Sequence, residues 1–250
     1  MSDLAAGPGA GARVPDLLAT APLRPRGFIA NASNHTLLVQ VGEAALGLHA
    51  VYKPRAGERP LWDFPTGSLC RREAAAYVVS EALGWGLVPP TVLRDDAPMG
   101  TGSVQLFVPH DPEDHYFVLV GDEATHAALV RMAVFDLLTN NADRKASHVL
   151  RTDDGWVYGC DHGLTFHVEP KLRTVIWDFD GAPVGREARE DLAWLADALD
   201  DGEAPVTAAL VDLIDGEEIA ALARRARLLA GLAELPDIDP DRRPYPWPPL

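Results

Sequence analysis

Cysteine and long apolar runs are both scarce in this chain. It holds two cysteines, Cys70 and Cys160, in 250 residues, too few for a disulfide framework or a zinc-ligand cluster. It has no run of about 18 apolar residues, the length that a membrane-spanning helix needs. The N-terminal segment lacks the basic and apolar regions of a secretory signal. We therefore expect a cytoplasmic protein with reduced thiols.

Positive charge is also in short supply. The chain has 22 Lys and Arg residues against 37 Asp and Glu residues, a net charge of −15. Such a surface repels the phosphates of nucleic acids and anionic lipid headgroups. We therefore expect no nucleic acid partner and no stable membrane association. The three lysines are Lys53, Lys145 and Lys171, and each is worth examining for a specific role.

Several common catalytic motifs are absent as well. The sequence has neither a Gly-x-Ser-x-Gly elbow nor a Walker-type phosphate loop, which excludes the simplest hydrolase and P-loop readings. The segment HDPEDH at 110–115 resembles a metal-ligand cluster. Nothing else completes a zinc shell around it, so we interpret it as a solvated loop.

The elements that are present run from strands to helices. The patterns predict strands at the ranges 36–41, 48–53, 91–93 and 103–108. They predict helices at 71–83, from Asp122 to about 139, and across 187–232 with breaks near 202–205 and 216. A β-rich front and a helical back predict an α+β fold with two lobes and a crevice between them.

The two ends of the chain differ from the body in composition. Residues 1–26 are rich in Ala, Gly and Pro and are interpreted as a flexible N-terminal arm, with a short helix around 15–18. The last fifteen residues hold six prolines, so the tail 236–250 should be extended, either docked through its aromatic side chains or disordered. The lobes then cover 27–108 and 109–235.

The most informative stretch is NNADRKASHVLRTDDGWVYGCDHGLTF at 140–166. Asp154-Gly155 between two strand-like segments predicts a hairpin with a two-residue turn. That turn would place His148 opposite Asp161 and bring Asp143 to the same end. Two carboxylates and an imidazole would then meet in loops on a rigid base, where catalytic groups are often found.

Phosphoryl transfer is the chemistry that suits this pair of aspartates. One carboxylate can accept a proton from a hydroxyl group or orient it, and the other can hold a hard divalent cation. The reaction also needs a cation on the phosphates. Lys53 ends a predicted strand, and Glu73 lies early in the following helix, where a carboxylate could hold the ammonium in place.

Five segments in order carry a resemblance to a known family. They are VYKP (51–54), REAAA (72–76), LVPPT (87–91), NADR (141–144) and DHGLTF (161–166). Together they resemble the phosphatidylinositol 3-/4-kinase catalytic family, with the type II phosphatidylinositol 4-kinases and an actinobacterial branch of bacterial relatives as the nearest members. The resemblance implies a two-lobed protein-kinase-like (atypical kinase) fold, with a nucleotide-binding N-lobe and a catalytic C-lobe.

The resemblance also implies a role for individual residues. Lys53 would contact the ATP phosphates and Glu73 would pair with Lys53. Asp143 would act on the acceptor hydroxyl, within a catalytic loop that also holds Arg144 and Lys145. Asp161 would hold Mg²⁺ or Mn²⁺. The lobe linker and the phosphate turn would complete the nucleotide site with Gln105, Phe107 and Val108, and with Ser33, Asn34 and Thr36.

Two departures from the family pattern leave alternatives open. The phosphate turn at 31–36 has no Gly-rich run, and His148 stands where the family usually has an oxygen ligand such as Asn. Magnesium prefers oxygen ligands, whereas imidazole suits softer ions. The protein then uses one metal ion, prefers manganese with His148 as a ligand, or binds nucleotide without catalysis.

The prediction is an ATP-dependent phosphotransferase acting on an unknown hydroxyl-bearing acceptor. The low positive charge favours a soluble protein or small molecule over a membrane lipid as that acceptor. The alternatives are a pseudokinase that serves as a nucleotide-binding regulatory module, and an AMP transferase. Residues 177–179, which follow the metal loop, would recognise the acceptor or anchor that segment.

Overall fold

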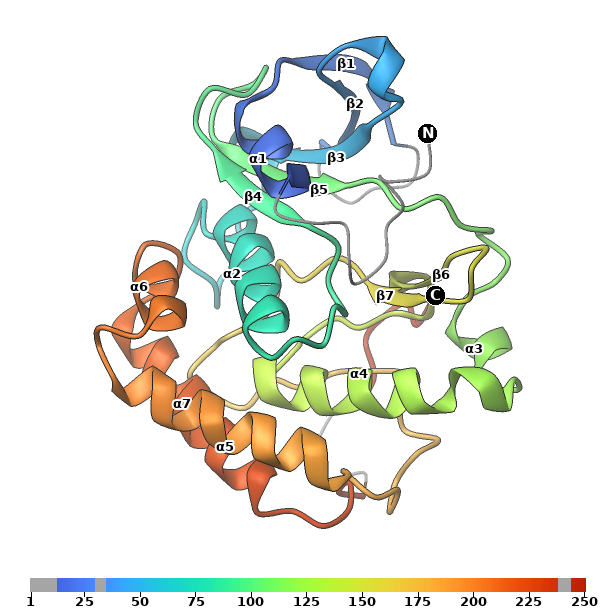
Figure 1. Cartoon of the computed structure of the whole chain (residues 1–250), viewed down its shortest axis with the longest axis vertical. Coiled ribbons are helices and arrows are strands. Elements are labelled where there is room, and N and C mark those ends of the chain that lie inside the picture. The colour runs from blue at the N-terminus through green and yellow to red at the C-terminus, as the bar shows by residue number, and fades with distance from the viewer. Residues whose placement is uncertain (1–12, 30–34, 238–243) are drawn as a thin grey trace.

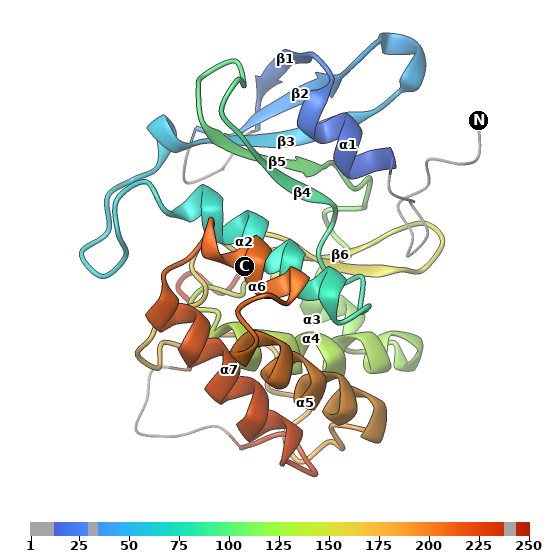
Figure 2. The same ribbon diagram turned by 60° about the vertical axis from the view of Figure 1, so that its left-hand side comes forward.

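The chain folds into a β-rich N-lobe and a helical C-lobe, as predicted (Figures 1 and 2). A computed structural model describes residues 13–29, 35–237 and 244–250. The N-lobe is a five-stranded antiparallel sheet in the order β1-β2-β3-β5-β4. The C-lobe is built on α4, α5, α6 and α7. The α+β class and the arrangement in two lobes are therefore confirmed.

Strand β3 shows how the sheet presents side chains to the space between the lobes. The strands are β1 (Leu23–Phe28), β2 (Leu37–Val41), β3 (His49–Pro54), β4 (Thr91–Arg94) and β5 (Gly102–Leu106). Along β3, Ala50, Tyr52 and Pro54 are buried. Because strand side chains alternate between faces, Val51 and Lys53 lie on the opposite face. Short 3₁₀ turns, η1 (Ala44–Leu46) and η2 (Arg55–Gly57), flank this strand.

The N-terminal segment is ordered over much of the range expected to be a flexible arm. Residues 13–20 form helix α1 (Arg13–Thr20), longer than the short helix expected, and residues 23–28 form β1. Val14 and Leu18 of α1 are buried in the N-lobe core, because both lie on one face of the helix. The flexible arm is thus wrong for residues 13–26. Residues 1–12 lie outside the described residues.

Helix α2 (Leu69–Ala82) joins the two lobes. It lies where a helix at 71–83 was predicted. The chain leaves the helix at Gly84, whose φ of +66° is the left-handed conformation that glycine adopts most readily. Buried residues of α2 pack against both β4 and α6. The helix therefore forms a shared wall between the lobes.

The C-lobe helices confirm the predicted helical back. They are α3 (Tyr116–Leu119), α4 (His126–Thr139), α5 (Arg186–Asp200), α6 (Pro205–Val211) and α7 (Gly216–Ala230). The breaks near 202–205 and 216 are present, with Pro205 starting α6 and Asp215 capping α7. Asp122 caps a 3₁₀ turn, η3 (Glu123–Thr125), immediately before α4. Helices α5 and α7 pack together in the main core.

The predicted hairpin exists, but its register differs by one residue. Strands β6 (Val149–Arg151) and β7 (Val157–Gly159) pair Val149 with Gly159, so His148 lies opposite Cys160 and not opposite Asp161 as predicted. The loop has three residues, 153–155, because Gly155 adopts a φ of +87° and Thr152 pairs with Trp156. A three-residue loop ending in a left-handed glycine is a common hairpin connection that the Asp-Gly pair also permits.

The C-terminal segment docks on the body through its backbone. The Pro244 carbonyl accepts the Thr174 N–H at 2.9 Å, and the Pro249 carbonyl accepts the Ala146 N–H at 2.8 Å. Tyr245 and Trp247 are 48% and 87% exposed, so the aromatic rings are not the main anchors. Residues 244–250 are therefore docked, but through backbone hydrogen bonds and not through the aromatic side chains that were predicted to dock them.

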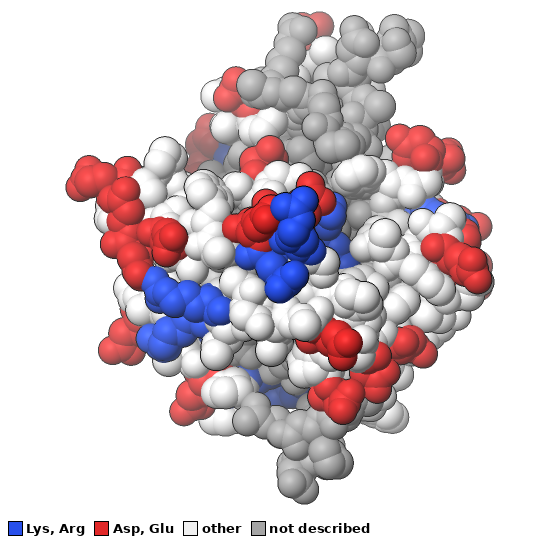
Figure 3. Space-filling model, turned by 60° about the horizontal axis from the view of Figure 1, so that its bottom comes forward, with Lys and Arg blue, Asp and Glu red and all other residues white. Residues whose placement is uncertain are grey.

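Acidic side chains surround the basic ones on the face drawn in Figure 3, where Lys and Arg form separate small groups. Among the described residues, no helix is both long enough and apolar enough to cross a membrane.

Candidate active site

A cavity of about 380 Å³ lies between the lobes. The N-lobe contributes residues of β3, α2 and β5, and the C-lobe contributes the loops at 143–148 and 160–164. Residues predicted to bind nucleotide, metal or acceptor line it: Thr36, Lys53, Glu73, Gln105, Phe107, Val108, Asp143, His148 and Asp161. Segments more than 100 residues apart in sequence thus meet at one site, as Lys53 and Asp161 do.

Lys53 is held between two carboxylates. Its Nζ contacts Oε1 of Glu73 and lies 2.9 Å from Oδ1 of Asp161. Burial alone would lower the pKa of Lys53, but the Asp161 and Glu73 carboxylates outweigh it and raise that pKa above its ordinary value. The second Glu73 oxygen, Oε2, accepts the His162 backbone N–H at 3.0 Å. The ammonium is therefore charged and fixed in the cavity.

Asp161 projects from a left-handed turn, with a φ of +57°. The Lys53 ammonium holds the pKa of Asp161 well below its usual range, although partial desolvation in the cavity acts in the opposite direction. Its side chain remains 45% exposed to the cavity. An ionised, accessible carboxylate of this kind suits a hard divalent cation.

His148 faces Asp161 and is uncharged. Its Nε2 lies 3.3 Å from Oδ2 of Asp161, and its Nδ1 accepts the Lys145 backbone N–H at 3.3 Å. Burial lowers the pKa of His148 to about 4 against the opposing effect of Asp161. Since Nδ1 accepts a hydrogen bond, the proton of the neutral ring is on Nε2, which donates toward Asp161.

Asp143 is the other carboxylate of the cavity. Its backbone N–H donates to Oδ1 of Asn141 at 3.0 Å, and its Oδ2 lies 3.5 Å from Nζ of Lys145. Burial raises the pKa of Asp143 to about 6, although the Lys145 ammonium opposes this change. A carboxyl group whose pKa is close to neutral can exchange a proton with an acceptor hydroxyl.

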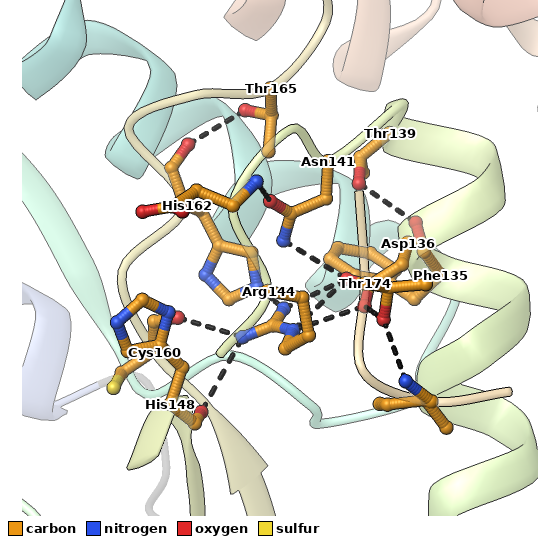
Figure 4. A network of polar contacts seen from close by, with 12 residues as sticks. Phe135, Asp136, Thr139, Asn141, Arg144, His148, Cys160, His162, Thr165 and Thr174 are labelled. Carbon is orange, nitrogen blue, oxygen red and sulfur yellow. Dashed lines mark hydrogen bonds and ion pairs between the residues drawn. The ribbon is translucent and has the colours of Figure 1, made fainter. Parts of the chain in front are cut away.

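Arg144 lies behind the cavity and does not line it. Figure 4 shows its guanidinium between Asp136 on one side and the 148 and 160 backbone on the other. Nη2 lies 2.9 Å from Oδ1 of Asp136, and Nη1 donates to the carbonyls of Cys160 at 2.8 Å and His148 at 3.4 Å. Arg144, predicted as catalytic, therefore fits a positioning role for both loops.

The predicted lobe linker follows β5. Its Phe107 N–H donates to the His49 carbonyl at 3.0 Å, and the Val108 carbonyl interacts with Nδ1 of His110 at 2.8 Å. Gln105 is buried, and its Nε2 donates to the Thr91 hydroxyl at 2.8 Å. The Phe107 N–H is therefore already paired with β3, although Phe107 lines the cavity. Ser33 and Asn34, predicted for the phosphate turn, lie outside the described residues.

Sequence reasoning missed several residues of the site. Glu58, Arg59 and Leu61, from the loop between β3 and α2, line the cavity, but a loop of mixed composition carries no local signal. Asp136 and His162 are fully buried partners of Arg144. A charged residue inside the apolar sequence VFDLL of α4 was the available signal for Asp136, because a buried charge needs a partner.

A divalent cation fits this donor set only together with a further ligand. The described residues contain no group of three or more His, Cys, Asp or Glu side chains able to hold a metal ion. Asp161 supplies an ionised carboxylate, and magnesium in such sites takes most of its other ligands from water and from substrate phosphates. The residues therefore fit an ion that arrives with a nucleotide.

Comparison with known proteins places the fold and the family. No family model matches the chain. The chain is 44% identical to "Protein Rv2133c" of Mycobacterium tuberculosis (strain ATCC 25618 / H37Rv), over 93% of this chain and 94% of that protein. Among solved structures, the Golgi casein kinase with Mn/ADP bound gives a TM-score of 0.53 at 14% identity, covering 90% of this chain and 78% of that chain. Another structure of the Golgi casein kinase gives the same TM-score at 16% identity, with the same coverage.

These matches correct the family resemblance drawn from the motifs. The assignment to the phosphatidylinositol 3-/4-kinase family is wrong, since the solved structures that share this fold include two of the Golgi casein kinase. The physical reason is that a lysine–glutamate pair and two loop aspartates serve phosphate and metal chemistry in many kinases. Such motifs do not distinguish one branch of the fold from another.

Proposed function

Because this chain belongs to the family of the mycobacterial Protein Rv2133c and has the fold of the Golgi casein kinase, we propose that it is an ATP-dependent phosphotransferase. One observation carries the proposal. Lys53, Glu73 and Asp161 are linked by ion pairs on one side of the cavity that Asp143 also lines. This is the set of groups that transfer of a phosphoryl group requires.

Each side chain has a task in this proposal. Lys53 binds the phosphates of ATP, and Glu73 holds its ammonium in place. Asp161 would hold Mg²⁺ or Mn²⁺, an ion that neutralises charge on the phosphates when bound. The structure of the Golgi casein kinase contains Mn/ADP, which supports a nucleotide and a divalent cation here. Val108 and Gln105 would contact the adenine side of the cavity.

Asp143 receives the proton in the transfer step. The acceptor oxygen forms a bond to the γ-phosphorus, the bond from that phosphorus to the bridging oxygen breaks, and ADP leaves. The hydroxyl proton moves to Asp143, whose pKa of about 6 leaves it mostly ionised at pH 7. The Lys145 ammonium lies 3.5 Å from Asp143 and would stabilise negative charge on the transferred phosphoryl group.

We propose a soluble acceptor, a protein or a small molecule. The net charge of −15 and the scattered basic groups on the face in Figure 3 disfavour an anionic membrane surface. The acceptor must present a hydroxyl group to the Asp143 carboxylate, which lines the cavity.

A pseudokinase is the second candidate, and His148 favours it. The Nε2–H of this residue points at Asp161, where an oxygen ligand would assist a second cation. A nucleotide-binding regulatory module would keep ATP affinity and lose transfer.

Intact-mass measurement tests the proposal. The purified protein is incubated with ATP and Mg²⁺ or Mn²⁺, with and without casein as a hydroxyl-bearing acceptor, and ADP release is followed. Transfer of phosphate to protein or water supports the proposal, and AMP addition would instead reveal an AMP transferase. ATP-dependent stabilisation without ADP release supports the pseudokinase. Asp161→Ala should abolish turnover, while Asp197→Asn, at an exposed position of α5, serves as the matched control.

A further inference from the structure

A second cavity, also of about 380 Å³, lies on the other side of α2. Its walls are η2, the loop 65–68, the first turn of α2 and the α6–α7 junction. It shares no lining residue with the cavity between the lobes. We name it the α2–α7 cavity, and its lining residues are Arg55, Pro65, Thr66, Gly67, Ser68, Arg71, Arg72, Val211, Leu213, Ile214, Asp215 and Glu218.

The two cavities flank the same turn of α2 from opposite sides. Leu69, Cys70 and Glu73 line the cavity between the lobes, whereas Ser68, Arg71 and Arg72 line the α2–α7 cavity. Successive helical residues differ by about 100° around the axis, so these two sets lie on opposite faces. A ligand in the α2–α7 cavity would therefore contact the helix turn that carries Glu73.

Two of the three arginine side chains that line this cavity have no partner among the described residues. The buried Arg72 donates to Oε1 of Glu218 and to the Thr165 carbonyl, both at 2.6 Å. Asp215 caps α7, so these carboxylates are occupied within the fold. Arg55 and Arg71 are exposed, and their side chains form no hydrogen bond or ion pair with another residue that the structure describes. The lining therefore carries three arginines against two carboxylates, a net charge of +1, and the guanidinium groups of Arg55 and Arg71 have no carboxylate partner.

The Arg55 guanidinium packs against Gly67, where there is no side chain. The φ of Gly67 is +78°, and a Cβ built on it would lie 2.3 Å from Nε of Arg55. The guanidinium therefore lies against the bare backbone, in space that any side chain at this position would take. Two guanidinium groups facing one cavity suit a dianion, because each can donate two parallel hydrogen bonds to phosphate oxygens.

The α6–α7 junction contributes three apolar side chains to this cavity, beside Asp215 and Glu218. Val211 is 61% exposed, and Leu213 and Ile214 follow it along the α6–α7 junction. A cavity of this volume is in the range of small-molecule sites. We propose that the α2–α7 cavity binds a small phosphate monoester, with the phosphate on Arg55 and Arg71 and the apolar organic part on Val211 and Leu213.

Isothermal titration with phenyl phosphate tests this site without relying on catalysis. We expect saturable binding of one molecule, retained in Lys53→Met, where phosphate binding between the lobes is impaired. Arg55→Ala and Arg71→Ala should each weaken binding at least about tenfold, which corresponds to about 1.4 kcal/mol. Inorganic phosphate should bind less tightly than phenyl phosphate, since it lacks the apolar part.

Two further variants keep the test specific. Gly67→Ala should weaken phenyl phosphate binding by displacing Arg55, and Arg224→Gln should leave it unchanged, because Arg224 is exposed on α7 and does not line the cavity. Thermal unfolding checks that each variant is folded. The proposal is overturned if no saturable binding occurs, if Lys53→Met abolishes it, or if the Arg55 and Arg71 variants bind like the parent protein. A phosphoserine peptide that binds more tightly than phenyl phosphate would overturn the choice of a small ligand.

Discussion

Replacing Asp136 by asparagine should strongly destabilise the protein. Asp136 and Arg144 are both fully buried, with side-chain exposures of 0%. Three hydrogen bonds of 2.9–3.1 Å join the guanidinium to the two carboxylate oxygens. The Asn141 amide and the Thr174 hydroxyl also donate to Asp136, at 3.0 and 3.1 Å. Asp136→Asn keeps the shape of the side chain and removes its charge.

The size of the expected loss in unfolding free energy follows from the Arg144 charge, which stays buried without its partner. Breaking a buried ion pair by removing one partner costs about 3–5 kcal/mol, because the other charge stays buried and unpaired. In addition, the asparagine NH₂ group would face donors on Arg144 and Thr174. For a chain of this size, about 3–5 kcal/mol corresponds to a fall in Tm of roughly 6–20 °C.

Urea unfolding followed by tryptophan fluorescence measures this loss, with the m-value checked for constancy. The control is Glu190→Gln, which breaks the exposed pair of Glu190 with Arg186 on α5 and should cost no more than about 0.5 kcal/mol. Asp136→Asn combined with Arg144→Gln should recover part of the loss, since no unpaired charge then remains.

A loss below about 1 kcal/mol for Asp136→Asn would refute this reasoning, because it would place the pair in the range of exposed ion pairs. Equal losses in the single and double variants would also refute it, since the cost would then not come from the unpaired guanidinium.

Four further predictions concern the proposed reaction. The value of kcat/KM should fall about tenfold per pH unit below about pH 6, because protonated Asp143 cannot accept the acceptor proton; a flat profile of ADP release from pH 5 to 8 would contradict this role. Asp143→Asn should lower kcat about 10²–10⁴-fold. It should also raise stability, because the free-energy cost of ionising Asp143 in the folded state builds up from its ordinary pKa of 3.8 to its raised pKa of about 6 and is complete above that. Urea unfolding at pH 5 and 8 checks the sign, since the stabilisation should be larger at pH 8, and a larger stabilisation at pH 5 would contradict it. Lys53→Met should abolish the ATP-induced rise in Tm, which would be several degrees at saturating ATP. The control Lys171→Met breaks a 3.1 Å pair with Asp63 and should retain that rise. Equal rises in both variants would exclude the proposed phosphate contact. His148→Asn should increase the stabilisation by MgATP relative to MnATP, since an amide oxygen suits magnesium better than imidazole does, and an unchanged ratio would show that His148 does not act on the cation.

Local pattern was enough to predict many of the elements. Alternation over 48–53 and the Gly84 stop led to β3 and α2 within a residue or two. The breaks at Pro205 and before Gly216 were likewise correct, because proline and glycine act on their own backbone. The segment at 13–28 shows where prediction from local pattern fails. Its Ala, Gly and Pro content suggested a loose arm, whereas Val14 and Leu18 are held by contacts with the N-lobe sheet.

The hairpin illustrates a finer limit. Asp154-Gly155 indicated a turn, but the same pair is compatible with a loop of two or three residues, and the register depends on that choice. The family resemblance failed for a related reason. Its motifs report which groups phosphate chemistry needs, and those groups recur across branches that differ elsewhere in the fold.

The sequence by itself therefore determined the fold class and the residue types of the chemistry: one lysine at a strand end, one glutamate in the next helix and two loop aspartates. Only the tertiary structure decided that Arg144 lies behind the cavity, that His148 faces Asp161 as a neutral donor, and that a second cavity borders α2. Burial, tautomer and charge pairing depend on atoms brought together from distant parts of the chain. Local sequence cannot encode them, because each is a property of what surrounds the residue.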